Sequence, residues 1–236
     1  MLDFDRFTHL TFDCYGTLID WERGILAALR PVLDHHGIAL SDDAALEHFG
    51  AYESAAERGP YRRYLDVLAT VMDGFGARFG FMPSADERAA LAASVGDWPP
   101  FPDTVEALQS LGRRFRLVIL SNIDDDLFAG SAKHLGVAFA AVITAEQVGS
   151  YKPDPRNFRA LIERLDVAPD RILHVAQSLF HDIAPANALG LTTVWVNRRH
   201  DRPGSGATPP ATARPDLEVP DMRTLAQLAG QSAPQR

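Results

Sequence analysis

The sequence predicts an α/β protein in which an all-helical cap is inserted into a doubly wound, Rossmann-like parallel sheet. Short apolar runs rich in β-branched residues alternate with helical patterns, as in sheets whose parallel strands are joined by helices. One long stretch, residues 18–98, carries helical patterns only. Hydrophobic residues make up 46% and charged residues 23% of the 236, which is ordinary for a globular chain with a sizeable core.

Five short apolar runs are expected to form the strands. Polar residues or glycine bound each of the first four, which are 8–14 (THLTFDC), 116–122 (RLVILSN), 171–177 (RILHVAQ) and 192–197 (TTVWVN). The fifth run, 140–144 (AAVIT), is shorter. Because all five are largely apolar rather than alternating, they fit a sheet that is covered on both faces.

The helices between these strands have recognisable starts. Asp103 and Glu106 predict a capping box at the start of the helix that follows the proline-rich segment 98–103 (WPPFPD). The acidic run 124–126 is expected at a helix N-terminus, where carboxylates are stabilised, rather than at a metal site. Segments 157–165 and 183–189 complete the alternation of strands and helices.

The segment after the first strand is expected to form the cap. Its four helical patterns are 22–37, 41–59, 61–80 and 85–96. Ser84 and Glu87 predict a capping box at the start of the last of them. Residues 1–17 and 99–236 are then the α/β core and 18–98 the cap, with 201–215 a surface loop and 230–236 a disordered tail.

Charge and composition exclude several functions. The net charge of -8 argues against nonspecific binding to nucleic acid or to an anionic membrane. The first residues lack a signal-peptide pattern, and no apolar run reaches the length of a membrane span. The single cysteine, Cys14, rules out a disulfide within the chain. We therefore expect a cytoplasmic protein with no nucleic-acid or membrane partner.

Polar residues follow each strand at the edge where ligands bind in open parallel sheets. Asp13, Tyr15 and Thr17 follow the first strand, and Ser121 and Asn122 end the second. The remaining candidates follow the later strands; these are Lys152 in SYKPDP, Gln177, Ser178 and Asp182. One cation, two carboxylates and several neutral donors would therefore meet at one edge of the sheet.

The ordered motifs FDCYGT, SN, YKPDP and HVAQSLFHD resemble those of the haloacid dehalogenase superfamily, and the resemblance covers nearly the whole chain, cap included. Most members are magnesium-dependent phosphatases with two aspartates one residue apart. Here Tyr15 replaces the second aspartate, and Gln177 replaces the first acidic residue of the fourth motif. The remaining carboxylates, Asp13 and Asp182, have Lys152 as a counter-charge, so we expect a site without metal or other cofactor.

The branch of that superfamily with tyrosine at this position resembles the L-2-haloacid dehalogenases. The resemblance implies that Asp13 attacks the α-carbon of a small 2-substituted carboxylate, displaces halide and forms an ester that water hydrolyses. It implies that Thr17 orients Asp13, that Lys152 keeps Asp13 ionised, and that Asp182 orients Lys152 or helps to activate water. The implied substrate-binding residues are Tyr15, Ser121, Asn122, Gln177 and Ser178.

The chain departs from this branch in the cap. The arginine that cradles the departing halide in the family falls near Gly50 or Ala51 here. The motifs also resemble a subgroup that includes azetidine-2-carboxylate hydrolase, in which the same aspartate opens a ring by breaking a C–N bond. In that alternative Glu53 or His181 would meet the ammonium group, and candidate cap contacts are Trp21, Tyr52 and Glu53.

Two further alternatives remain open from the sequence. The first is a phosphatase of the same superfamily, and the second is a protein that binds a metabolite or partner without turning it over. The apolar faces of the cap helices also allow a homodimer, which family members often form.

Overall fold

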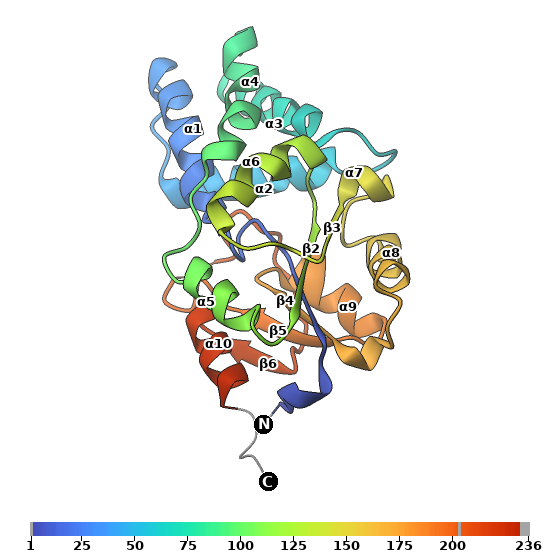
Figure 1. Cartoon of the computed structure of the whole chain (residues 1–236). Helices are drawn as coiled ribbons and strands as arrows, with labels where there is room; N and C mark the ends of the chain where they lie inside the picture. The colour runs from blue at the N-terminus through green and yellow to red at the C-terminus, as the bar shows by residue number, and fades with distance from the viewer. Residues whose placement is uncertain (1, 203, 232–236) are drawn as a thin grey trace.

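The computed structural model describes residues 2–202 and 204–231, which form an α/β core and a helical cap (Figure 1). The described strands form one six-stranded sheet in the order β3-β2-β1-β4-β5-β6, and every pairing is parallel. Their bounds are β1 His9–Phe12, β2 Arg116–Ser121, β3 Ala141–Thr144, β4 Ile172–Ala176, β5 Thr192–Val196 and β6 Leu217–Val219. The predicted Rossmann-like fold is confirmed, as are all five predicted strands.

Helices cover both faces of the sheet because successive strand residues point to opposite sides. On β2, Val118 and Leu120 pack in one cluster with α8 Pro155–Leu165 and α9 Ala184–Ala188. Leu117 and Ile119 pack in the other, larger cluster with residues of α5, α6 and α10. The remaining core helices are α5 Thr104–Leu111, α6 Asp125–Leu135, α7 Ala145–Val148 and α10 Met222–Gly230. The described residues also form four short helical turns, which are η1 Phe4–Arg6, η2 Val95–Asp97, η3 Pro169–Arg171 and η4 Leu179–Ile183.

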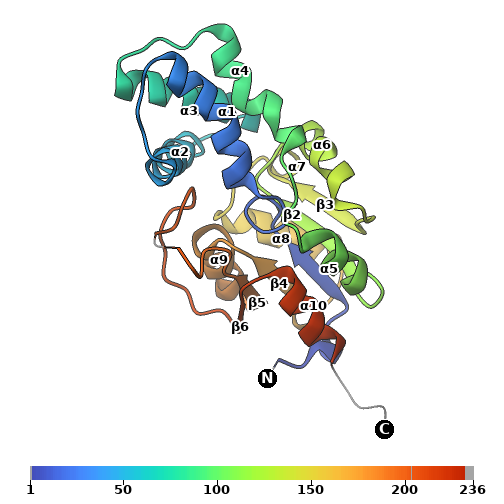
Figure 2. The same cartoon turned by 90° about the vertical axis from the view of Figure 1, so that its left-hand side faces the viewer.

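The cap lies beyond the carboxyl ends of the strands, over the edge where the site residues gather (Figure 2). It consists of α1 Trp21–His35, α2 Asp42–Ala56, α3 Tyr64–Phe79 and α4 Ala85–Ser94, in agreement with the four predicted helical patterns. The two segments that join it to the core pair with each other: Asp20 N donates to Pro99 O (2.8 Å), and Phe101 N donates to Leu18 O (3.0 Å). These bonds hold the start and the end of the insertion side by side.

One of the two predicted capping boxes is present. Ser84 and Glu87 form theirs at the start of α4. Asp103 does not cap α5; its carboxylate instead accepts hydrogen bonds from Arg198 Nη1 (2.8 Å) and from Met222 N at the start of α10 (2.7 Å). The prediction failed because a capping residue can serve a helix distant in sequence, and neither β6 nor α10 was predicted.

The expectation that 201–215 is a surface loop is wrong for its middle. The described part of this segment contains no helix or strand, but Gly206, Ala207 and Thr208 are buried. Ala207 packs on the cap at Gly50, where an added Cβ would lie 2.2 Å from Ala207 O. Glycine on α2 therefore lets this core segment reach the cap. Residues 232–236 of the predicted tail lie outside the described residues, and Gly230 ends α10.

Among the helices of the described residues, none combines the length and the apolar character that crossing a membrane requires.

Candidate active site

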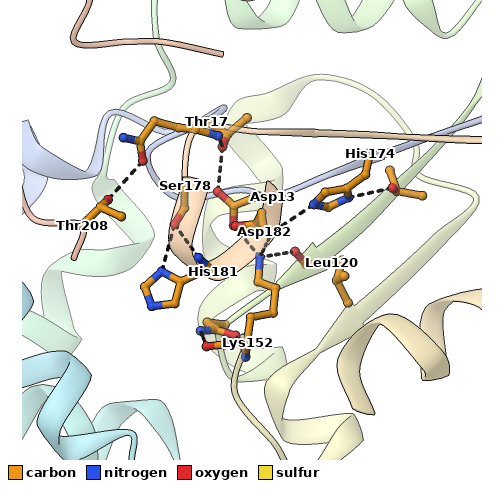
Figure 3. A network of polar contacts seen from close by, with 12 residues as sticks. Asp13, Thr17, Leu120, Lys152, His174, Ser178, His181, Asp182 and Thr208 are labelled. Carbon is orange, nitrogen blue, oxygen red and sulfur yellow. Dashed lines mark hydrogen bonds and ion pairs between the residues drawn. The ribbon is translucent and has the colours of Figure 1, made fainter. Parts of the chain in front are cut away.

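Four residues from three motifs meet at the carboxyl ends of the central strands (Figure 3). Asp13 follows β1, Thr17 lies in the next turn, Lys152 follows α7, and Asp182 lies in the turn η4 after β4. Because β1 and β4 are neighbours in the sheet, their ends place Asp13 and Asp182 side by side. The structure thus brings together the four residues that the sequence marked as catalytic.

Lys152 is the centre of this cluster. Its Nζ donates to Asp13 Oδ1 (2.9 Å), Asp182 Oδ1 (2.7 Å) and the carbonyl oxygen of Leu120 (2.9 Å). The side chain is only 2% exposed. Burial alone would lower the pKa of Lys152, but the two carboxylates outweigh it and raise that pKa, so the ammonium stays charged.

Asp13 has a second partner on its other oxygen. Thr17 Oγ1 donates to Asp13 Oδ2 (2.7 Å) and accepts from Gln177 N (2.9 Å), which fixes the hydroxyl in place. Burial raises the pKa of Asp13, while Lys152 opposes that shift. Both oxygens of the carboxylate are thus oriented, and Lys152 supplies the charge that favours its ionised form.

Asp182 is held from the opposite side by His174, a residue that the sequence reasoning missed. His174 Nε2 donates to Asp182 Oδ1 (3.0 Å), and Thr11 Oγ1 donates to His174 Nδ1 (2.9 Å). Although burial acts to raise the pKa of Asp182, Lys152 and His174 lower it. The available signal was a histidine in the otherwise apolar run ILHVA, since a buried polar side chain needs a partner.

Asn122 lies at the site, but its amide already has partners. Its amide forms two hydrogen bonds with the backbone of Lys152, accepting from Lys152 N (2.7 Å) and donating to Lys152 O (3.0 Å). These bonds fix the backbone from which the lysine side chain extends. Asn122 also lines the cavity described next, where it lies beside Ser121, whose buried Oγ has no partner.

A cavity of about 40 Å³ lies between this cluster and the cap. It is lined by most of the residues that the sequence proposed for substrate binding and by cap residues; the full set is Asp13, Tyr15, Trp21, Glu53, Glu57, Ser121, Asn122, Lys152, Gln177, Ser178, His181, Asp182 and Thr208. Tyr52 is not among them, because its ring packs between α2 and α3 against His48 and Phe75.

Two of the expected substrate-binding side chains are already engaged. The hydroxyl of Tyr15 is hydrogen-bonded to Ser131 Oγ on α6 (2.8 Å), and its ring packs edge-on against Trp98. Gln177 Oε1 accepts from Thr208 Oγ1 (3.1 Å), in the segment whose burial the sequence did not predict. Both side chains still line the cavity, so they shape it even where their polar atoms are paired.

The cap contributes two acidic side chains from α2 and the turn after it. Glu53 is 4% exposed and accepts a short hydrogen bond from Tyr64 OH; burial raises its pKa to about 7. Glu57, which the sequence analysis did not single out, is half-buried, and burial followed by the charge of Glu53 raises its pKa well above the usual range. Glu53 is therefore partly protonated at neutral pH, and the shift of Glu57 is in the same direction.

His181 presents a polar atom to the same cavity. Its backbone N donates to Ser178 Oγ (2.8 Å), and its Nδ1 lies 3.2 Å from the same oxygen. Nε2 is buried and has no hydrogen-bond partner among the residues that the structure describes. Burial lowers the pKa of His181 to about 4, so the imidazole is neutral at pH 7.

The residues around Asp13 do not fit a resident magnesium ion. Such an ion needs several oxygen ligands, preferably carboxylates. The facing oxygens of Asp13 and Asp182 both bind Lys152 Nζ, and the ring of Tyr15 stands where a second aspartate would be. Within residues 2–202 and 204–231, the one group of three or more acidic, histidine or cysteine side chains close enough to share an ion is His35, His36 and Glu87 in the cap.

Comparisons with known proteins agree with this architecture. The curated (S)-2-haloacid dehalogenase 1 of Pseudomonas sp. (strain CBS-3) is 28% identical over 193 residues, which span 79% of this chain and 83% of that protein. The glyceraldehyde 3-phosphate phosphatase of Methanothermobacter thermautotrophicus is 31% identical over 179 residues, 72% of this chain and 75% of that protein. The relatives thus include both dehalogenases and phosphatases.

The fold matches solved structures over nearly its whole length. The L-2-haloacid dehalogenase of Xanthobacter autotrophicus, solved with chloropropionic acid covalently bound, superposes with a TM-score of 0.77 at 22% identity, covering 96% of this chain and 100% of that one. The sequence profile of the haloacid dehalogenase-like hydrolases matches residues 7–190, which is most of the chain. The chain is therefore a hydrolase that belongs to the haloacid dehalogenase-like family.

Proposed function

We propose that this protein hydrolyses a bond at the α-carbon of a small 2-substituted carboxylic acid, with halide as the leaving group and without a metal ion. The observation that carries the proposal is the position of Lys152 Nζ, 2.9 Å from Asp13 Oδ1 and 2.7 Å from Asp182 Oδ1. The ammonium group supplies positive charge between two carboxylates, so Asp13 can be an ionised nucleophile without a dication. The haloacid dehalogenases among its relatives support the choice of substrate class.

The reaction would take place in two steps. In the first, an oxygen of the Asp13 carboxylate attacks the α-carbon, the carbon–halogen bond breaks, and halide leaves with the bonding electrons. In the second, water attacks the carbonyl carbon of the resulting ester, and Lys152 stabilises the negative charge that develops on the carbonyl oxygen. Collapse of that intermediate releases a 2-hydroxy acid and restores the carboxylate of Asp13.

The other residues of the cluster have assigned roles in this scheme. Thr17 holds Asp13 in the attacking orientation through the bond to Oδ2, and Asn122 holds the backbone of Lys152. Ser121 Oγ is free to donate to the substrate carboxylate. Asp182, oriented by His174, lines the cavity and is the acceptor for a proton of the attacking water.

A second candidate function is opening of a strained ring by cleavage of a C–N bond, as in L-azetidine-2-carboxylate. The observation that favours it is the pair Glu53 and Glu57 on the cap side of the cavity. The pKa of Glu53, raised to about 7, makes it a proton donor at neutral pH, burial raises the pKa of Glu57 as well, and an amine leaves more readily when it is protonated. In this reading the same Asp13 attacks the same carbon, and only the leaving group differs.

A three-substrate assay tests these functions. Purified protein is incubated with 2-chloropropionate, L-azetidine-2-carboxylate or an aryl phosphate, each with and without a chelator. We expect chelator-resistant halide release, lost in Asp13→Asn. Chelator-resistant ring opening without halide release would assign the second function instead. Phosphate release that the chelator abolishes would contradict both, and so would an Asp13→Asn variant with full turnover.

The ester intermediate has its own test in water enriched in oxygen-18. In a single turnover with enzyme in excess, the oxygen of the product comes from Asp13, and the heavy isotope should enter the carboxylate of Asp13. Mass spectrometry of the peptide that contains Asp13 measures this. Heavy oxygen in the first-turnover product would instead show direct attack by water and overturn the two-step scheme.

A further inference from the structure

Two residues that line the catalytic cavity each carry a buried polar atom that lacks a hydrogen-bond partner among the described residues. Within the described residues, four buried side-chain nitrogen or oxygen atoms lack a hydrogen bond: Arg63 Nε, Ser121 Oγ, His181 Nε2 and Arg199 Nε. Both arginines form ion pairs through their guanidinium groups. Ser121 and His181 therefore remain, and both line the same cavity. A buried polar atom without a partner is unfavourable, which indicates that a bound molecule supplies the partner.

The hydrogen bonds of Ser178 determine which nitrogen of His181 carries the proton. Ser178 Oγ accepts from the backbone N of His181, and in the part of the chain that the structure describes its own hydrogen has one acceptor, His181 Nδ1. A proton on Nδ1 would leave the serine hydroxyl without an acceptor. This arrangement favours the tautomer with the proton on Nε2, which makes that nitrogen an N–H donor on a residue that lines the cavity.

His181 also lies at a boundary between two cavities. A second cavity of about 280 Å³ adjoins the catalytic one, and Glu57, Lys152 and His181 line both. Arg58 lines the larger cavity, is exposed, and forms no ion pair with the described residues. A small anion that is released beside His181 thus has a path toward a free guanidinium.

We propose that the Nε2–H of His181 binds the departing halide and that the adjoining cavity with Arg58 is its exit route. This inference rests on the proposed dehalogenase function and names the donor that the reaction needs. A halide that forms in a water-poor pocket requires a cation or a hydrogen-bond donor. Helix α2 offers none at Gly50, because that position packs against the backbone of Ala207.

The chemistry of the neighbouring groups is compatible with an anion at this place. Burial and the charge of Glu53 raise the pKa of Glu57 well above the usual range, which favours its neutral form and weakens its repulsion of a halide. Ser121 lies on the core side, beside Asn122 and Lys152, where it can bind the substrate carboxylate. An N–H donor suits a halide and would oppose an ammonium leaving group.

The test compares two variants and two leaving groups. His181→Leu removes the donor, whereas His181→Gln keeps an amide N–H near the position of Nε2. Halide release in the first turnover is measured with 2-chloro- and 2-bromopropionate. For His181→Leu we expect chloride release to slow about 10- to 100-fold, the range for loss of one donor to a developing anion. Bromide release should slow less, because bromide is the better leaving group and the weaker acceptor, and His181→Gln should recover much of the rate.

A direct measure of halide binding accompanies the kinetics. Sodium bromide should inhibit the wild type as a product, sodium sulfate of equal ionic strength serves as the control, and His181→Leu should be several-fold less sensitive to bromide. Equal slowing of chloride and bromide release in His181→Leu, with unchanged bromide inhibition, would show a structural role and overturn this inference alone. A wild type that releases no halide from either substrate would overturn the proposed function and this inference together.

Discussion

The two halves of the catalytic cavity, on the core side and on the cap side, differ in whether their carboxyl groups are paired with a cation. On the core side, Lys152 pairs with Asp13 and Asp182, and all three side chains are at most 9% exposed. On the cap side, Glu53 and Glu57 have no cationic partner within the described residues, and their hydrogen bonds come from Tyr64 and Asn122. On the core side Lys152 and His174 lower the pKa of Asp182 against the effect of burial, and Lys152 opposes the rise that burial causes at Asp13. On the cap side burial raises the pKa values of Glu53 and Glu57 without an ion pair among the described residues to oppose it.

This difference separates the groups that attack the α-carbon from the groups that suit a particular leaving group. The core half fixes a charged nucleophile and its counter-ion, and these suit attack on the α-carbon whatever group departs. The cap half contributes the glutamic acids, which suit an amine as leaving group, whereas the proposed halide donor, His181, belongs to the core turn η4 and lines the adjoining cavity together with Glu57 and Arg58 of the cap. A chain with the same core half and another cap half would thus be expected to attack the same carbon but release a different group.

The largest expected effect comes from removing the charge of the core half. Lys152→Met leaves Asp13 and Asp182 buried without a counter-ion, and breaking a buried pair in this way costs about 3–5 kcal/mol of folding free energy. We expect turnover to fall about 10³-fold, because the nucleophile becomes protonated and the ester oxygen loses its stabilising charge. Halide-release kinetics and chemical unfolding at pH 7 measure the two effects.

The pH dependence of that variant gives a second check. Without Lys152 the two carboxylates should bind a proton more readily than in the wild type, and the loss of stability should shrink as the pH falls. Lys152→Arg keeps the positive charge but changes the shape of the side chain. It is therefore the control that separates the effect of charge from the effect of shape. A stable Lys152→Met variant with wild-type turnover would show that the core half does not depend on paired charge.

A smaller effect is expected on the cap side, where the predicted change depends on pH. The pKa of Glu53 is about 7 in the folded protein against 4.5 in an unpaired glutamate, so folding favours its protonated form. The stability that this proton contributes is present below pH 4.5 and is lost as the pH rises through 7. Relative to Glu53→Gln, which cannot ionise, the wild type should lose on the order of 3 kcal/mol between pH 4.5 and 8.

Unfolding by urea at several pH values measures this difference. The glutamine keeps an oxygen that accepts from Tyr64, so the comparison isolates the charge. A stability difference that does not vary with pH would mean that Glu53 is already ionised in the folded protein, and the contrast between the two halves would then disappear.

The same contrast explains what the sequence could predict. The strand ends and the segments that follow them carry Asp13, Thr17, Lys152 and Asp182. Neighbouring parallel strands bring these ends together irrespective of the conformation of the loops. Thr208 reaches the cavity from a segment without regular structure, and its place depends on the contact between Ala207 and Gly50. Two further contacts that the sequence did not predict, Asp103 with Arg198 and Asp124 with α3, also join residues that are far apart in the chain. Local capping patterns carry no information about such contacts.

A smaller loss of turnover than in Lys152→Met is expected when Asp13 loses one hydrogen bond but keeps its ion pair with Lys152. Thr17→Val removes the hydroxyl that donates to Asp13 Oδ2 and leaves Gln177 N without its acceptor. A charge-assisted hydrogen bond of this kind contributes about 1.5–3 kcal/mol, so kcat should fall about 10- to 100-fold. Thr17→Ser keeps the hydroxyl and should stay close to the wild type. Equal rates in both variants would show that Lys152 alone orients the nucleophile.

The smallest effect is expected where the two halves are joined. Asp124 precedes α6 in the core, yet its carboxylate accepts from Tyr64 N (2.9 Å) and Leu65 N (3.2 Å) at the start of the cap helix α3, and from Tyr61 OH (3.0 Å). Asp124→Ala should cost about 1–2 kcal/mol, as for other capping residues. Asp124→Asn can still cap α3 and should retain most of the stability.

Because α3 also carries Tyr64, the partner of Glu53, the alanine variant should alter the pH dependence of stability that Glu53 causes, while the bond between Lys152 and Asp13 is untouched. If Asp124→Ala instead abolished turnover at full stability, the cap would act on the nucleophile directly, and the division between attack in the core and selection in the cap would be wrong.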